Sequence, residues 1–254
     1  MEYAEVNGIH LAYERRGHGM PLVLLHGYPL DHSIWLEIGP LLQDSFDLIL
    51  PDLRGFGGST TTTSDYGVAE IAADIAALLD ALAIRKVCLA GHSMGGYVAL
   101  AFARAYGDRL SGLGLVSTQA LADPPDRQQG RYATAQQVSQ EGVGFIAASM
   151  PEKLSPDPRV SAFCRDLISQ QARPGVIGAL KAMASRPDST TLLASLDLPV
   201  AILHGTDDAL IPVDRAREMK EALPSAHFVE LPGVGHMPMM ETPAGTAAAL
   251  RHLL

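Results

Sequence analysis

The sequence predicts an α/β protein with a mostly parallel central sheet and helices on both of its faces. Apolar runs of about five residues, the usual length of a strand, alternate with longer amphipathic stretches over most of the chain. Such alternation is typical of βαβ units, whose right-handed crossovers distribute helices over both faces. Between residues 119 and 190 the alternation stops and seven prolines separate short amphipathic pieces, which predicts a helical insertion.

The first half of the chain begins with a predicted hairpin, because Asn7-Gly8 stands between two short alternating runs, residues 2–6 and 9–15. The elements that follow are assigned from apolar runs and from helical periodicity. In chain order we predict a strand at 21–25, a helix at 32–43, a strand at 46–50, a helix at 67–84, a strand at 86–90, a helix at 97–106 and a strand at 113–117.

The second half contains the insertion and then a return to alternating strands and helices. We predict helices at 127–140, 142–150, 158–172 and 174–185, a strand at 199–204, a helix at 212–222, a strand at 226–231 and a helix at 238–253. Pro212 stands at the first turn of its helix, where a missing amide is tolerated. The predicted organisation is a core domain of residues 1–118 and 191–254 with an inserted helical subdomain of residues 119–190.

Charge and hydropathy exclude several classes of partner. The 254 residues carry a formal net charge of −9 without a cluster of Lys or Arg, so nucleic acid is not an expected partner. No apolar run reaches the ~18 residues of a membrane span, and the acidic start Met1–Glu5 lacks the apolar core of a signal peptide. We therefore expect a cytoplasmic protein that does not associate with a membrane. Cys88 and Cys164 are too few for a zinc site, and no disulfide is expected.

The most informative motif is Gly91-His92-Ser93-Met94-Gly95-Gly96, which stands between a predicted strand and a predicted helix. A G-x-S-x-G sequence in this position forms a sharp turn that exposes the serine hydroxyl, and glycines are needed where the two backbones nearly touch. The hydroxyl then lies at a helix N-terminus, where amide N–H groups favour developing negative charge. Ser93 is therefore the candidate nucleophile.

A serine nucleophile needs a base and a carboxylate that orients the base. Among nine histidines, His236 follows the last strand in a Gly-rich loop at the carboxyl edge of the sheet, where ligands bind in parallel α/β folds. His26 and His204 end strands and are expected to form local hydrogen bonds, and His92 is expected to point away from Ser93. The carboxylate follows the strand at 199–204, and its spacing leaves both Asp207 and Asp208 open.

These motifs resemble those of the α/β-hydrolase superfamily, and the resemblance covers nearly the whole chain. Four motifs match in the family's order: His26-Gly27-Tyr28-Pro29, Asp52-Leu53-Arg54-Gly55-Phe56-Gly57-Gly58-Ser59, Gly91–Gly96, and Gly205-Thr206-Asp207-Asp208 with Gly235-His236. The family's pattern places the acid three residues after the glycine and four before Pro212, which selects Asp208. It also implies oxyanion N–H groups on Tyr28 and Met94, and a helical cap, or lid, at residues 119–190.

Within the superfamily, the stretch His26–Trp35 is similar to small bacterial carboxylesterases, enol-lactonases and cofactor-free haloperoxidase relatives. The resemblance implies hydrolysis of carboxylic esters of small, mainly apolar substrates through an acyl-enzyme, without a metal or organic cofactor. Enol-lactone hydrolysis, perhydrolysis, carbon–carbon bond hydrolysis and non-catalytic ligand binding are the alternatives. Ser93 argues against haloalkane dehalogenases and epoxide hydrolases, which use aspartate as nucleophile.

The remaining expectations concern the substrate pocket. Its candidate residues are large and apolar: Trp35, Phe145, Met150, Met183 and Met237, together with Tyr28. Arg54 lies in an Asp-x-Arg-Gly setting that predicts an ion pair stabilising its loop rather than a contact to an acidic substrate. The oligomeric state is not specified by any of these patterns.

Overall fold

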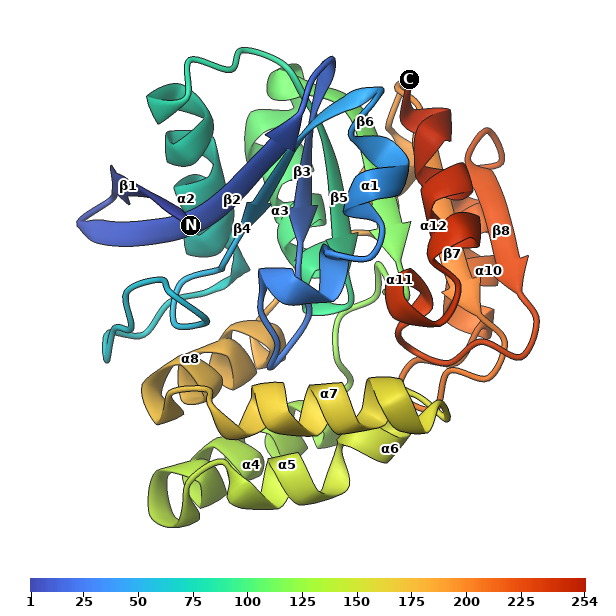
Figure 1. Ribbon diagram of the computed structural model, residues 1–254. Helices are drawn as coiled ribbons and strands as arrows, with labels where there is room; N and C mark the ends of the chain where they lie inside the picture. The colour runs from blue at the N-terminus through green and yellow to red at the C-terminus, as the bar shows by residue number, and fades with distance from the viewer.

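The computed structural model describes residues 1–254, and its centre is an eight-stranded sheet with the strand order β1-β2-β4-β3-β5-β6-β7-β8 (Figure 1). The strands are β1 (Glu2–Val6), β2 (Ile9–Gly17), β3 (Met20–Leu25), β4 (Phe46–Pro51), β5 (Val87–His92), β6 (Leu110–Val116), β7 (Val200–Gly205) and β8 (His227–Leu231). The β1–β2 hairpin turns at Asn7-Gly8, as predicted, and β2 pairs antiparallel with β4. All pairs from β4 to β8 are parallel, which confirms the predicted sheet.

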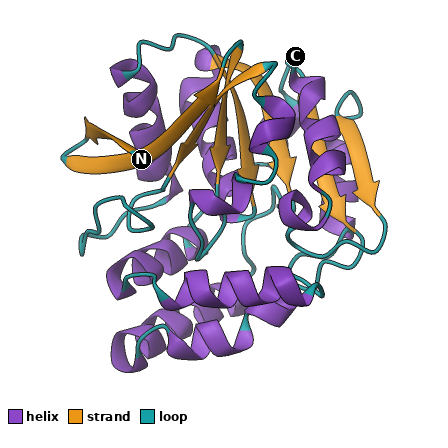
Figure 2. Cartoon of the chain, in the orientation of Figure 1, coloured by secondary structure: helices purple, strands orange, loops and turns teal.

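Helices cover both faces of this sheet (Figures 1 and 2). On one face, α2 (Val68–Ala81) packs against α3 (Met94–Tyr106), and α10 (Asp214–Ala222) packs on β7. On the other face, α1 (Gly39–Leu42) lies against α12 (Pro243–Leu250). The strands β3 to β7 are contiguous apolar runs and are mostly buried, as expected for a parallel sheet covered on both sides, whereas β8 at the sheet edge is half-buried.

Two predicted helices are broken, and a proline explains each break. The helix predicted at 32–43 is a 3₁₀ turn, η1 (His32–Trp35), followed by the short α1, in which Pro40 occupies the first turn. The helix predicted at 238–253 is divided into α11 (Pro238–Glu241), α12 and the 3₁₀ turn η3 (Arg251–Leu253), with a new start at Pro243. Proline has no amide hydrogen and clashes with the preceding turn, so it begins a helix but rarely continues one.

The chain between β6 and β7 is helical and gathers at the carboxyl edge of the sheet (Figure 1). Its helices are α4 (Pro125–Glu141), α5 (Gly144–Ser149), α6 (Pro151–Leu154), α7 (Pro158–Ser169), α8 (Arg173–Ala184) and α9 (Thr190–Ala194). The α4 and α8 helices pack on each other, and α7 contacts both α5 and α6. Parallel strands present their functional loops at this edge, so the helical segment lies next to the candidate site.

The hydrophobic core is continuous through the sheet and the helical segment. Trp35, Phe46, Phe56 and Phe102 are its largest fully buried side chains. Cys88 and Cys164 are buried free thiols. Across the whole chain, the helices are too short or too polar for any one of them to span a bilayer.

Candidate active site

The turn between β5 and α3 has the geometry predicted for a nucleophile elbow. Ser93 has φ 51° and ψ −113°, a strained conformation for a residue with a side chain, and its amide donates to the carbonyl of Val116 at 2.9 Å. A Cβ on Gly91 would lie 2.1 Å from the carbonyl oxygen of Gly95, and a Cβ on Gly95 would lie 2.5 Å from that of Leu25. Only glycine fits at these two positions, because the clashing atoms belong to the backbone.

A second support of the elbow comes from Thr118, which the sequence analysis did not identify. Its Oγ1 donates to the carbonyl oxygen of Ser93 at 2.8 Å. A Cβ on Gly96 would lie 2.4 Å from that Oγ1, so the glycine leaves room for the threonine. Thr118 stands two residues beyond β6, and its contact could not be read from spacing because it depends on how β6 pairs with β5.

The structure pairs the imidazole of His236 with the carboxylate of Asp208. His236 Nδ1 lies 2.6 Å from Asp208 Oδ2, and both residues are buried. Asp208 Oδ1 accepts the amides of Leu210 and Ile211, each at 2.9 Å. Burial alone would raise the pKa of Asp208, but the charge of His236 and the hydrogen bonds outweigh burial and hold this pKa well below its usual range. The neighbouring Asp207 is exposed and accepts only the hydroxyl of Thr206.

His236 lies beside the elbow, although no hydrogen bond joins it to the hydroxyl of Ser93 in the structure. The link is His92, whose Nε2 donates to the carbonyl oxygen of His236 at 2.8 Å and whose ring centroid is 4.7 Å from the ring of His236. His92 is completely buried, and burial lowers its pKa well below the ordinary value, so it is neutral. Ser93 itself is half-buried and accessible from outside.

The loop that carries His236 is fixed on both sides. The His236 amide donates to the carbonyl oxygen of Leu154 in α6 at 2.9 Å, which ties the loop to the helical segment. The carboxylate of Glu241 accepts the amides of Gly235 at 2.8 Å and Met237 at 3.1 Å. The position of the imidazole therefore depends on the core and on the helical segment together.

One of the two predicted oxyanion residues, Tyr28, lies in a loop against the elbow, and the other, Met94, is part of the elbow. Tyr28 follows β3 in the loop after Gly27, and a Cβ on Gly27 would lie 3.1 Å from the Cβ of Ser93, so this loop runs against the candidate nucleophile. Met94 is the first residue of α3, where helix amides have no partner within the helix. Tyr28 is also buried with its hydroxyl unpartnered, and burial raises the pKa of that hydroxyl above its usual range while the charge of Arg131 acts against the rise.

The apolar pocket candidates separate into two groups. Trp35 and Met237 lie next to the paired histidines; both are fully buried, and the Trp35 ring meets the His92 ring edge-on with centroids 6.4 Å apart. Phe145, Met150 and Met183 belong to the helical segment, and Met183 Sδ accepts Nη1 of Arg131 at 3.3 Å. Phe145 and Met150 are only partly buried.

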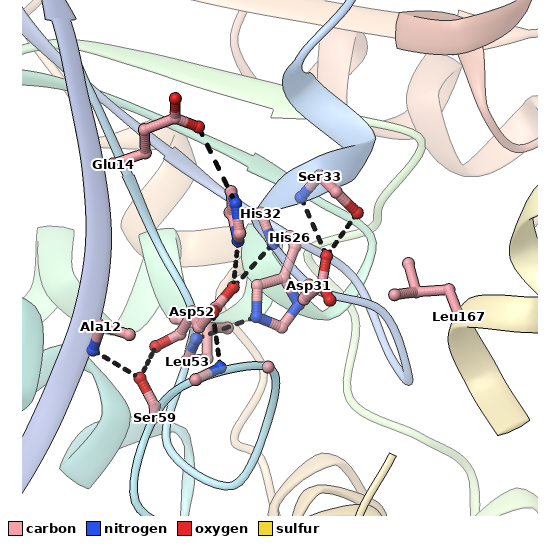
Figure 3. Close-up of polar contacts among 12 residues, drawn as sticks. Ala12, Glu14, His26, Asp31, His32, Ser33, Asp52, Leu53, Ser59 and Leu167 are labelled. Carbon is pink, nitrogen blue, oxygen red and sulfur yellow. Dashed lines mark hydrogen bonds and ion pairs between the residues drawn. The ribbon is translucent and has the colours of Figure 1, made fainter. Parts of the chain in front are cut away.

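A cluster of titratable side chains lies under the loop after β4 (Figure 3). His32 Nδ1 lies 2.6 Å from Asp52 Oδ1, and Asp52 Oδ2 accepts the amide of Gly58 at 2.8 Å. Burial would lower the pKa of His32, but the Asp52 carboxylate outweighs it and raises that pKa. Ligand atoms of Asp31, His32 and Asp52 lie within 4.8 Å of one another, but both oxygens of Asp52 already accept hydrogen bonds, so the cluster anchors the loop.

Two expectations about this region are confirmed. His26 accepts the amide of Leu53 at Nε2, 2.9 Å away (Figure 3). Its Nδ1 donates to the carbonyl of Gly27 at 3.0 Å, which is the local role predicted for it. Arg54 makes a two-pronged ion pair with the buried Asp74, with distances of 2.6 and 2.7 Å. The guanidinium is therefore already paired within the protein.

A parallel sheet whose carboxyl edge carries a strained serine turn and a buried histidine–aspartate pair belongs to the hydrolase class of α/β proteins. The sequence agrees with this, because residues 20–243 match the family model described as alpha/beta hydrolase fold. The chain therefore belongs to the α/β-hydrolase family.

Three similar proteins include an esterase and an enol-lactonase. A thermophilic esterase from Thermogutta terrifontis, solved with malate bound, is 39% identical with a TM-score of 0.95, and the match covers 99% of this chain and 97% of that one. The enol-lactonase from Burkholderia xenovorans LB400 is 25% identical with a TM-score of 0.91, and the match covers 99% of both chains. The AB hydrolase superfamily protein YisY from Bacillus subtilis is 29% identical over 89% of this chain and 88% of its own.

Proposed function

We propose that this chain is a serine hydrolase that cleaves carboxylic esters of small, mainly apolar substrates, with Ser93, His236 and Asp208 as its catalytic residues. The observation that carries the proposal is the 2.6 Å pair between His236 and Asp208, held beside the strained Ser93 turn through the His92 contact. A hydroxyl, an imidazole and a buried carboxylate in this arrangement are the parts of an acyl-transfer site.

In the proposed reaction, Ser93 Oγ attacks the ester carbonyl carbon while His236 Nε2 takes the hydroxyl proton. Asp208 accepts the Nδ1–H of His236, which leaves the Nε2 lone pair free to act as a base and stabilises the imidazolium that forms. The attack requires the Ser93 hydroxyl to come within hydrogen-bond distance of His236, a contact that often tightens only when substrate is bound.

The tetrahedral intermediate carries its negative charge on the former carbonyl oxygen. The amide N–H groups of Tyr28 and Met94 are the proposed donors to it, and one such donor typically lowers the barrier by about 2.7–4 kcal/mol. When the carbon–oxygen bond of the ester breaks, the alcohol leaves with the proton from His236. Water then attacks the acyl-enzyme by the same route and releases the carboxylic acid and free Ser93.

We further propose that residues 119–190 act as a cap over this site. The His236 amide bonds to Leu154 of the segment, and Arg159 of α7 donates to the carbonyl oxygen of Met240 at 2.8 Å. The first contact connects the cap to the loop that carries the base, and the second connects it to α11, which follows that loop. The apolar side chains that the cap contributes, Phe145, Met150 and Met183, are the proposed contacts to the substrate, with Trp35 and Met237 on the core side.

The relatives support an ester or a lactone as the scissile group, since one is an esterase and another an enol-lactonase. Enol-lactone hydrolysis, perhydrolysis and carbon–carbon bond hydrolysis use the same three side chains, so the fold alone does not choose among them. Non-catalytic ligand binding is disfavoured because the His236–Asp208 pair is intact.

A matched substrate panel tests the proposal. p-Nitrophenyl esters of increasing acyl length, an enol-lactone and a β-diketone are incubated with the wild-type chain and with Ser93→Ala, which changes one hydroxyl and leaves the elbow backbone in place. The proposal expects turnover of short esters that falls by orders of magnitude in Ser93→Ala. Ester turnover in Ser93→Ala within tenfold of wild type would refute it, and faster turnover of the lactone or diketone would redefine the reaction.

A further inference from the structure

A second histidine contacts the carboxylate that is paired with His236. His204 is the penultimate residue of β7 and is completely buried. Its Nε2 lies 3.1 Å from Asp208 Oδ2 and 2.8 Å from the carbonyl oxygen of Ile211. Both of these oxygens are acceptors, so Nε2 carries a hydrogen, which is donated to Ile211 and makes a second, longer contact with Asp208 Oδ2. The other ring nitrogen, Nδ1, is buried without a partner, which fits an unprotonated atom.

The oxygen that His204 contacts is the one that His236 contacts. Asp208 Oδ2 receives His236 Nδ1 at 2.6 Å and His204 Nε2 at 3.1 Å, while Oδ1 receives the two backbone amides. The carboxylate therefore has four donors, and two imidazoles share one oxygen. A hydrogen bond to a carboxylate oxygen reduces the negative charge that this oxygen offers to any other partner.

We propose that His204 is a positioning residue, which donates to the Asp208 oxygen shared with His236 and so limits how strongly Asp208 holds the His236 imidazolium. This inference rests on the proposed function and adds a fourth side chain to it. A base that keeps its proton too strongly returns to its neutral form only at higher pH and is a poorer catalyst near neutrality. His204 keeps the carboxylate oriented while moderating this hold.

The other charged or titratable groups near this pair are unchanged by a substitution at residue 204. His92 from β5 faces the His236 ring, and Glu241 from α11 accepts amides of the same loop. Glu230 on β8 is the register partner of His204, and it is paired with Arg217 at 2.8 Å. A change in the pH dependence after substitution of His204 is therefore assigned to the shared oxygen.

The test compares His204→Leu, which removes the donor, with His204→Gln, whose side-chain amide can place an N–H near the former Nε2. His227→Leu is the matched control, because His227 lies on β8 against His252 and does not contact Asp208. The readout is kcat/KM for a short p-nitrophenyl ester between pH 5 and 9, with the fraction of intact sites measured by organophosphonate titration.

In His204→Leu the acidic limb of the profile should move upward by about one pH unit, which is roughly a tenfold loss at low pH and little loss at high pH. His204→Gln should restore most of the shift, and His227→Leu should leave the limb in place. The proposal would be overturned if the acidic limb of His204→Leu stayed in place or moved to lower pH. A loss of kcat/KM that is the same at every pH leaves the limb in place and would overturn it too.

A measurement on the unmodified protein covers the case in which His204→Leu does not fold. Nitrogen-15 NMR of the histidine side chains should show His204 as the Nε2–H tautomer with a hydrogen-bonded proton. An Nδ1–H tautomer would overturn the proposal, because Nε2 would then have no hydrogen to give to Asp208. Failure of the proposed function would look different: ester turnover would survive in Ser93→Ala, whatever the tautomer of His204.

Discussion

Replacing Asp208 by Asn tests how the carboxylate fixes the imidazole. The Asn carbonyl oxygen can keep the two amide hydrogen bonds that Oδ1 accepts in the structure, from Leu210 and Ile211. Its NH₂ group then faces His236 Nδ1, where the carboxylate oxygen stood 2.6 Å away. His236 must accept at Nδ1 and carry its hydrogen at Nε2, so it can no longer take a proton from Ser93.

The magnitude follows from these contacts. The wrong tautomer should lower kcat for a short ester by about 10⁴. The free energy of unfolding should fall by about 2–4 kcal/mol, because two bonds to a buried charge are lost while the two amide bonds survive in a neutral and weaker form. Steady-state kinetics and urea denaturation at pH 7 measure the two quantities on the same preparation.

Asp207→Asn is the matched control, because it changes an adjacent exposed carboxylate that contacts only Thr206. It should leave kcat unchanged and alter the free energy of unfolding by less than ~0.5 kcal/mol. The reasoning would be refuted if Asp208→Asn kept kcat within tenfold of wild type, or if both substitutions reduced kcat equally.

Three further predictions concern stability. Tyr28→Phe should raise the free energy of unfolding by about 1 kcal/mol, because it removes a buried hydroxyl without a partner; a thermal denaturation midpoint clearly below wild type would show that this hydroxyl is bonded. Gly95→Ala should lower the free energy of unfolding by at least ~1–3 kcal/mol, because its Cβ would lie 2.5 Å from a backbone oxygen. Gly107→Ala is the control and should not destabilise the protein, because Gly107 has φ −57° and open space where its Cβ would lie. Equal urea midpoints for the two variants would contradict the packing of the elbow. Burial tends to raise the pKa values of Asp52, Asp123 and Asp208, but their partners outweigh burial and lower all three. These carboxylates therefore contribute their full stabilisation to the folded protein above the unfolded-state pKa of about 4, and the contribution is lost as the pH falls below that value toward the folded-state pKa. Urea denaturation at pH 7 and pH 3.5 should show this loss, and it should be smaller in Asp123→Asn, which lacks the carboxylate bonded to Arg131 and Arg186; an equal loss in both chains would exclude Asp123 as a source.

The parts of the fold that sequence could predict are those set by local pattern. Buried parallel strands are contiguous apolar runs, so β3 to β7 were placed within a few residues, as was the half-buried β8. The elbow was also predictable, because the glycine spacing and the flanking elements specify the backbone conformation of Ser93 by themselves. The helices at 32–43 and 238–253 were predicted too long, since periodicity continues through Pro40 and Pro243 although a helix does not.

The parts that sequence could not predict depend on contacts between distant residues. Spacing alone left Asp207 and Asp208 equal; the resemblance to the family selected Asp208, and the structure shows that this carboxylate faces His236. His92 contacts a carbonyl 144 positions away, and His204 shares an oxygen with His236. The position of a histidine at the end of a strand predicts its local hydrogen bonds but not its contacts to distant residues, because those are fixed by how the loops meet at the sheet edge.

The central claim is that Ser93 is an activated nucleophile, and covalent titration tests it most directly. A p-nitrophenyl phosphonate should release about one equivalent of nitrophenol per chain, with the label on the peptide that contains Ser93 and none in Ser93→Ala. Labelling should slow by orders of magnitude in His236→Gln, which removes the base. No covalent label on Ser93 at concentrations that inhibit close relatives, or equal labelling rates with and without His236, would contradict the account.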